Sequence, residues 1–210
     1  MFEEILSKTA IEVVESLAPH LELFYLAGGT GLGLQLGHRK SNDLDFFSSE
    51  LFNTDAMLSL VSADKVFLTA LGTVHCDIKG IRISLLYYKV PLIHPALSWY
   101  GIKVAHLKDI VAEKIKAISQ RGSKKDFIDL YAVLKMKYSV PEVCDFFKSR
   151  FKASDINYYH VVKSLVFFED AEQEPSPVII LPGEDWKWEN IKYFFVANIG
   201  LFEQEFGLSS

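Results

Sequence analysis

The stretch that decides the fold is AGGTGLGLQLGHRKSNDLDFF, residues 27–47, in which a Gly-Gly turn precedes two aspartates that flank one leucine. The apolar run 23–27 predicts a buried strand before the turn, and residues 30–36 predict a helix after it. Glycine lets backbone N–H groups approach a ligand closely, and helix N-termini attract anions. The backbone of Gly28, Gly29 and Thr30 is therefore expected to hold a phosphate.

The two aspartates, Asp43 and Asp45, lie on the next predicted strand, and thirteen residues separate Gly29 from Asp43. Successive side chains of a strand point to opposite faces, so these two carboxylates point the same way. Converging carboxylates are hard oxygen ligands that suit Mg²⁺, which would in turn hold a nucleoside triphosphate. Asp-x-Asp pairs also occur on solvated strand ends. Here Phe46 and Phe47 follow directly, which favours a position at the mouth of a core strand.

These residues resemble the signature of the nucleotidyltransferase superfamily, in which a Gly-Gly pair is followed by Asp-apolar-Asp-apolar. Two segments together, GGTGLGLQLGHRKSNDLDFF at 28–47 and LKDIVAEKIKAISQRGSKKDFIDLYAVL at 107–134, resemble the AbiEii/AbiGii-type toxin group of that superfamily. The resemblance implies an α/β (α+β) fold, with a nucleotidyltransferase-like mixed sheet, flanking helices and a C-terminal helical domain.

The same resemblance implies a function. The protein would be an Mg²⁺-dependent nucleotidyltransferase that moves a nucleotidyl group from an NTP to an acceptor such as tRNA or another RNA. It would be the toxin of an abortive-infection toxin–antitoxin pair, with an antitoxin protein as its partner. Composition and spacing by themselves indicate nothing about toxicity.

The second segment adds candidate catalytic residues. Lys114 lies two helical turns before Arg121, so both can face one side of a helix, and Asp126 and Asp129 share a face of the next helix. Within the resembling group, Lys114 and Asp126 match catalytic positions, and Arg121 and Asp129 are expected to support them. A purely structural alternative is an ion pair between Arg121 and Asp126 that joins the two helices.

The predicted site thus has three sets of residues. The catalytic set is Asp43, Asp45, Lys114 and Asp126; the metal ligands are Asp43 and Asp45; the nucleotide-binding set is Gly28, Gly29, Thr30, Arg39 and Arg121. All of them are expected to meet in one cleft between the N-terminal and C-terminal halves. Arg39 is the least specific member, because a short charged run such as 38–40 is often a solvated loop.

One position departs from the superfamily pattern. A third carboxylate is usual on a later strand, but the strand 81–87 carries Ser84 at the place where it is expected. Asp77, on the preceding strand, is a candidate replacement, although a solvated hairpin end is an equally good interpretation of Asp77. Without a replacement, the site would operate with two acids and the helical residues.

Composition limits the other possibilities. The 210 residues are 50% hydrophobic and 23% charged, enough to bury a core, and the net charge of −5 argues against general nucleic-acid coating. Only Cys76 and Cys144 are present, so no disulfide framework or zinc cluster is expected. No secretion signal or membrane span is evident, which predicts a cytoplasmic protein without a membrane partner.

The order of predicted elements indicates two domains, an α/β nucleotidyltransferase domain at 1–100 and a helical domain at 101–210 that completes the cleft. Helices are expected at 2–17, 30–36, 53–61, 106–120, 123–137, 141–151, 155–168 and 186–206, and strands at 23–27, 43–46, 66–70, 73–78 and 81–88. Asn53 or Thr54 is expected to cap the helix that ends at Val61, and Lys79-Gly80 to form a tight hairpin turn between the last two strands. The segment 173–183, which contains Pro175, Pro177 and Pro182, is expected to be a surface connection.

Two alternative functions remain open. A phosphatase or glycosyltransferase could use an Asp-x-Asp pair, but a haloacid-type phosphatase has a hydrophobic strand directly before its first aspartate, where Ser41 and Asn42 stand here. The second alternative is a non-catalytic nucleotide-binding or partner-binding module of the same fold. The replacement of an acid by Ser84 favours that alternative.

Overall fold

The computed structural model describes residues 1–181 and 183–208; Pro182, one of the prolines of the expected surface connection, lies outside them. The chain divides into two compact units, Met1–Leu107 and Lys108–Ser210, and each is described by itself. Among the described residues, none of the helices is both long and apolar enough to cross a membrane.

Unit 1 is built on a seven-stranded mixed sheet in the order β3-β4-β5-β2-β1-β7-β6. Strands β2 and β5 are parallel, as are β1 and β7, and the other neighbouring pairs are antiparallel. The elements run in the order η1 (Glu3–Ile5), α1 (Lys8–Leu17), η2 (Ala18–His20), β1 (Tyr25–Leu26), α2 (Gly28–Leu36), β2 (Leu44–Ser48), α3 (Thr54–Val61), β3 (Lys65–Ala70), β4 (Thr73–Ile78), β5 (Ile81–Tyr87), β6 (Leu97–Trp99) and β7 (Ile102–Val104).

Local sequence signals account for several of these boundaries. The Ser7 hydroxyl accepts a hydrogen bond from the Ala10 N–H and caps α1, so the helix expected from residue 2 begins at Lys8 after a 3₁₀ turn. Asn53 caps α3 in the same way, as the sequence predicted. Lys79 and Gly80 join β4 to β5 with φ angles of 53° and 79°, values that suit a tight hairpin turn.

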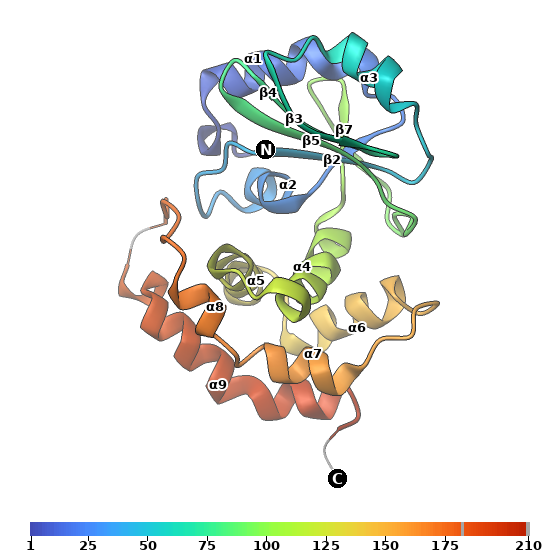
Figure 1. The fold of residues 1–210 in the computed structure, drawn as a ribbon. Coiled ribbons are helices and arrows are strands. Elements are labelled where there is room, and N and C mark those ends of the chain that lie inside the picture. The colour runs from blue at the N-terminus through green and yellow to red at the C-terminus, as the bar shows by residue number, and fades with distance from the viewer. Residues whose placement is uncertain (182, 209–210) are drawn as a thin grey trace. The chain divides into compact units, whose positions relative to one another are not determined.

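At the centre of the sheet, one face is apolar and the other face is polar. Leu44 and Phe46 of β2 are fully buried, and β5 and β4 show the same alternation. Helices α1 and α3 lie across one side of the sheet, and α2 lies on the other (Figure 1). The half-buried residues of these strands, including Asp45 and Ser84, occupy the polar face.

The sheet extends beyond residue 100, where the sequence analysis placed a domain boundary. Strands β6 and β7 form a hairpin around Tyr100 and Gly101, and β7 pairs with β1. Both strands have three residues, too few to produce a readable alternation of polar and apolar side chains. The contacts of the chain place the boundary at Leu107.

Unit 2 is helical and has an aromatic core. Phe127 packs against Phe168, Trp188 and Phe195, with ring centroids 5.1–5.9 Å apart. The elements are α4 (Leu107–Arg121), α5 (Lys124–Met136), α6 (Val140–Arg150), α7 (Tyr158–Ser164), α8 (Glu169–Glu172), η3 (Glu184–Trp186) and α9 (Trp188–Glu205). The single helix expected over 155–168 is shorter and is followed by the separate turn α8.

Buried ion pairs join the helices of unit 2. Lys114 on α4 lies between two carboxylates of α5, with its Nζ 2.7 Å from Asp126 Oδ1 and 2.6 Å from Asp129 Oδ2. All three side chains are buried. Arg121 at the end of α4 binds the other oxygen of Asp126 at 2.9 Å. Burial alone would raise the pKa of Asp126, but Lys114 and Arg121 outweigh it and lower that pKa to about 2.

The depressed pKa of Asp126 predicts a stability that depends on acid pH. A carboxyl group whose pKa is lower in the folded state than in the unfolded chain stabilises the fold when it is ionised. This stabilisation is complete at pH values above the pKa of the unfolded chain, near 4, and is lost as the pH falls to the folded-state pKa near 2. The shift of the Asp126 pKa from 3.8 to about 2 corresponds to about 2–3 kcal/mol, most of which is lost by pH 2. The free energy of unfolding of Asp126→Asn should therefore lie below that of the parent at pH 6, with the gap narrowing by about 2 kcal/mol by pH 2.

Chemical denaturation across this pH range measures the gap. Asp145→Asn is the matched control, because Asp145 makes an exposed i,i+3 pair with Lys148, and such surface pairs contribute little. A gap between Asp126→Asn and the parent that stays constant with pH would contradict the electrostatic account of this cluster.

Candidate active site

The centre of the candidate site in unit 1 is the contact between Gly28 and Asp45. Gly28 has a φ of +61°, and a Cβ added to it would lie 2.9 Å from Asp45 Oδ2. The Ala27 N–H also donates to the Asp45 carbonyl at 3.0 Å, because β1 and β2 pair there. Only glycine combines this left-handed backbone with so close a carboxylate. The Gly-Gly turn and the second aspartate therefore meet, as the sequence predicted.

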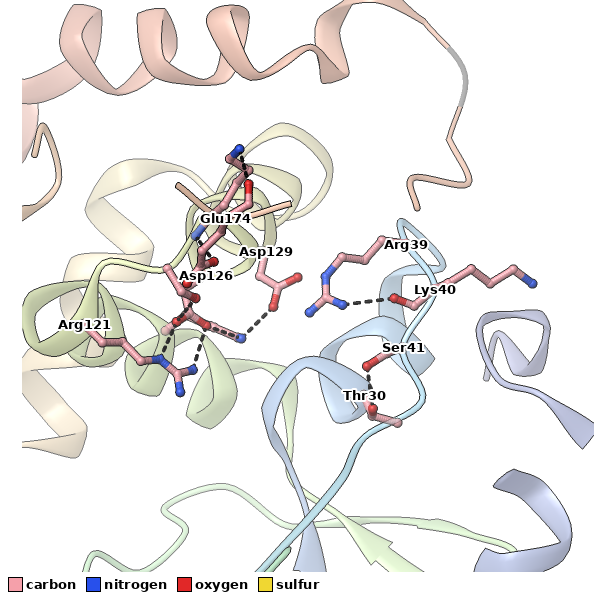
Figure 2. A network of polar contacts seen from close by, with 11 residues as sticks. Thr30, Arg39, Lys40, Ser41, Arg121, Asp126, Asp129 and Glu174 are labelled. Atoms are coloured by element: carbon pink, nitrogen blue, oxygen red, sulfur yellow. Dashed lines mark hydrogen bonds and ion pairs between the residues drawn. The ribbon is translucent and has the colours of Figure 1, made fainter. Parts of the chain in front are cut away.

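Gly29 is in close contact with a cation instead. A Cβ on Gly29 would overlap Nη2 of Arg39, so the guanidinium lies directly against the backbone of the turn. Arg39 Nη1 donates to the Lys40 carbonyl at 3.0 Å, which fixes the orientation of the side chain (Figure 2). Arg39, the least specific of the predicted binding residues, is thus brought to the turn together with Gly28, Gly29 and Asp45.

The turn also begins helix α2. The first helical hydrogen bond runs from the Gly31 N–H to the Ala27 carbonyl, so the N–H groups of the three preceding residues have no intrahelical acceptor. The Thr30 hydroxyl lies 2.7 Å from Ser41 Oγ and donates to the Asp43 carbonyl (Figure 2). This hydroxyl therefore fixes the segment that leads to Asp43, and phosphate binding by the Thr30 backbone stays a prediction.

The two aspartates suit a hard divalent cation. Asp43 is exposed and immediately precedes β2, while Asp45 lies within β2 and is half-buried. Across residues 1–181 and 183–208, no group of three or more His, Cys, Asp or Glu side chains is placed to hold a metal ion. Two protein carboxylates nevertheless fit Mg²⁺, which usually takes one or two carboxylates and completes its shell with water and substrate phosphate. One of these two carboxylates, that of Asp45, lies against Gly28 of the Gly-Gly turn.

The strand register identifies what occupies the neighbouring strand. Ser84 on β5 lies directly beside Asp45 on β2, which is the position of the expected third carboxylate. Asp77 on β4 is paired with Arg82, and its Oδ1 accepts a hydrogen bond from the Gly80 N–H at 2.8 Å. Asp77 thus stabilises the hairpin turn, and β5 separates its strand from β2.

The other predicted residues form the ion-pair cluster of unit 2. Asp126 is surrounded by donors: Lys114, Arg121 and the Ser123 hydroxyl, which lies 2.8 Å from Oδ2 (Figure 2). The predictions that Lys114 and Arg121 share a side of α4, and that Asp126 and Asp129 share a face of α5, are confirmed. The ion pair between the two helices is also present. Convergence of this cluster with Asp43 and Asp45 stays a prediction, since each unit is described by itself.

The sequence analysis missed one polar partner of these residues, Ser123, and a neighbouring contact between Lys124 and Glu174. Ser123 precedes Asp126 by three positions, a spacing typical of a capping pair at a helix start, and this signal could have identified it. Lys124 Nζ donates to the Glu174 carbonyl at 2.6 Å, and the Lys124 N–H donates to the Glu174 carboxylate. No sequence signal connects residues 50 positions apart.

Neither cysteine is suited to nucleophilic chemistry. Cys76 and Cys144 are free and buried. Burial raises the pKa of Cys76 to about 11 and that of Cys144 to about 12, so both remain thiols at neutral pH.

Comparisons with known proteins identify the family of the chain. The family model described as nucleotidyl transferase AbiEii toxin, type IV toxin–antitoxin system, matches residues 13–79 and 86–194. An uncharacterized protein of Aquifex aeolicus, aq_aa25, is 34% identical over 200 residues, covering 91% of this chain and 93% of its own length.

Solved structures with low sequence identity share the fold. MenT4, a nucleotidyltransferase toxin of Mycobacterium tuberculosis, has a TM-score of 0.60 at 17% identity, covering 96% of this chain and 87% of its own. JHP933 of Helicobacter pylori has a TM-score of 0.51 at 17% identity, covering 96% and 97% of the two chains. The family match extends over both segments that carry the Gly-Gly, Asp-x-Asp and Lys114–Asp126 residues. The chain belongs to the AbiEii nucleotidyltransferase toxin family.

Proposed function

We propose that this nucleotidyltransferase toxin moves a nucleotidyl group from an NTP to an RNA acceptor such as tRNA, in an Mg²⁺-dependent reaction. The observation that carries the proposal is the contact of Asp45 Oδ2 with the Gly28 backbone. It joins a metal-binding carboxylate to a turn that can hold phosphate.

Asp43 and Asp45 would hold the metal. When bound, Mg²⁺ would neutralise the polyphosphate and orient the α-phosphate. The backbone of Gly28 and Gly29, at the start of α2, would hold the phosphate tail through N–H groups. Arg39 lies against the same turn and would add a fixed positive charge to it.

Two cationic side chains of unit 2, Lys114 and Arg121, would also contribute. Lys114 would steady the charge that develops on the leaving pyrophosphate. Asp126 already receives hydrogen bonds from Lys114, Arg121 and Ser123, so its role would be to orient those groups. The side chain of Arg121 is 60% exposed and remains accessible to a phosphate on its outer side.

The partners follow from the family. A type IV toxin–antitoxin family implies an antitoxin that opposes this protein in the cell, and we propose that both act in the cytoplasm. Arg39, whose guanidinium lies against the Gly-Gly turn, supports an RNA acceptor, because phosphate backbones bind to local positive charge.

Substitution of the aspartates tests the reaction. Asp43→Asn or Asp45→Asn should lower Mg²⁺-dependent transfer of labelled nucleotide by at least about a hundredfold, since each removes a carboxylate that would hold the Mg²⁺ ion needed to neutralise the reacting phosphate. The melting temperature without ligand should stay level or rise slightly, because two like charges no longer repel. The rise in melting temperature that Mg²⁺-NTP gives the parent should disappear.

Asp55→Asn is the control, because Asp55 is an exposed residue in the first turn of α3. Retention of transfer in the Asp43→Asn, Asp45→Asn double variant would place the reaction elsewhere. Binding of Mg²⁺-NTP by the parent without transfer to any acceptor would instead indicate a nucleotide-binding role.

Two glycine substitutions separate the effect of backbone strain on stability from the effect of site geometry on ligand binding. Gly28→Ala and Gly80→Ala both place a Cβ on a left-handed backbone, which costs about 1–2 kcal/mol. Nothing lies within 4 Å of a Cβ at Gly80, whereas a Cβ at Gly28 displaces the Asp45 carboxylate. Both should lose similar stability in denaturation.

Only Gly28→Ala should weaken Mg²⁺-NTP binding, by at least tenfold, about 1.4 kcal/mol, as measured by calorimetry. Equal affinities in the two variants would show that the position of Asp45 against the turn does not determine binding.

A further inference from the structure

Three polar side chains form a row across the polar face of the sheet. Asp45 on β2 pairs with Ser84 on β5, and Ser84 pairs with His75 on β4. The Ser84 hydroxyl lies 3.1 Å from Nδ1 of His75, within hydrogen-bonding distance, and both side chains are half-buried. The row connects the proposed metal ligand to an imidazole through one hydroxyl.

The spacing of the strands determines how far Ser84 and His75 lie from a group held at Asp45. Neighbouring strands lie about 4.8 Å apart. Ser84 is therefore within direct reach of a group held at Asp45, whereas His75 is about twice as far away. His75 can influence a reaction at Asp45 only through the Ser84 hydroxyl.

The reaction requires a group that takes a proton. An acceptor hydroxyl must lose its proton as its oxygen attacks the α-phosphorus, and carboxylates that hold a cation are poor proton acceptors. Asp77, the nearest acid on the strand of His75, pairs in register with Arg82 and bonds to the Gly80 N–H. On this part of the sheet, the imidazole of His75 is the better placed base.

We propose that Ser84 and His75 form a proton relay for nucleotidyl transfer, an inference that rests on the proposed function. Ser84 contacts the acceptor hydroxyl, and His75 is a positioning residue that accepts the Ser84 proton at Nδ1. This arrangement requires the tautomer with its proton on Nε2, so that Nδ1 receives the hydrogen bond from Ser84.

Each proton and each electron pair that moves in this step has a donor and an acceptor. The acceptor O–H bond breaks and its proton passes to Ser84 Oγ, as the proton of Ser84 passes to His75 Nδ1. The acceptor oxygen forms a bond to the α-phosphorus, and the bond from that phosphorus to the pyrophosphate oxygen breaks. Pyrophosphate leaves with the electron pair, and His75 releases its proton to water afterwards.

The tautomer of His75 can be measured without any turnover. Long-range ¹H–¹⁵N spectra of the labelled protein resolve the nitrogens of its six histidines, and the signal lost in His75→Asn identifies His75. The relay predicts an unprotonated Nδ1 and a protonated Nε2, with a shift of the Nδ1 signal in Ser84→Ala. A proton on Nδ1 in the parent would overturn the relay.

Kinetics test the relay in the complete reaction. Ser84→Ala and His75→Ala should each lower kcat by about a hundredfold, within the usual range for general base catalysis, while KM for the NTP and the affinity for Mg²⁺-NTP stay level. Thr73→Ala is the matched control, because Thr73 lies on the same face of β4 and has no place in the proposed machinery.

His75→Asn separates proton transfer from structure. Its amide oxygen can still accept the hydrogen bond from Ser84 but cannot take up a proton at neutral pH, so its kcat should fall as far as that of His75→Ala. Full activity of His75→Asn, or of Ser84→Ala, would overturn the relay and leave the proposed function intact. A parent protein that transfers no nucleotide to any acceptor would instead overturn the proposed function, and the relay with it.

Discussion

The candidate site depends on the close packing of the Asp45 carboxylate against the Gly28 backbone. A side chain at Gly28 would lie 2.9 Å from Asp45 Oδ2, and the φ of +61° disfavours any residue other than glycine. This contact sets the end of β1, the start of α2 and the position of the acid together. The Gly-Gly turn and the Asp-x-Asp strand are therefore one local structure.

Long-range strand pairing places the other polar groups of unit 1 around this contact. Ser84 lies beside Asp45 because β5 is parallel to β2, and His75 lies beside Ser84 because β4 is antiparallel to β5. The Arg39 guanidinium, fixed by the Lys40 carbonyl, covers the second glycine. In unit 2, Lys114 is buried between two carboxylates, and a buried charge without such partners would be costly.

The sequence predicted the parts of the fold that local chemistry determines. The Gly-Gly turn, the Asp-x-Asp strand, the Asn53 cap and the Lys79–Gly80 hairpin all have short-range signals. The strands β6 and β7 were missed because three residues are too few to show a period. The contact of Arg39 with Gly29 and the bond between His75 and Ser84 follow from tertiary packing and strand register, which no local pattern encodes.

The most direct test of the account is the location of a bound divalent cation in unit 1. Mn²⁺ added to the ¹⁵N-labelled protein broadens the amide signals of nearby residues. The account predicts selective broadening at Gly28, Gly29 and the strand 44–46, and its loss in the Asp43→Asn, Asp45→Asn double variant. Broadening centred on another acidic segment, such as Glu169 and Asp170 of α8, and unchanged in that variant, would contradict it.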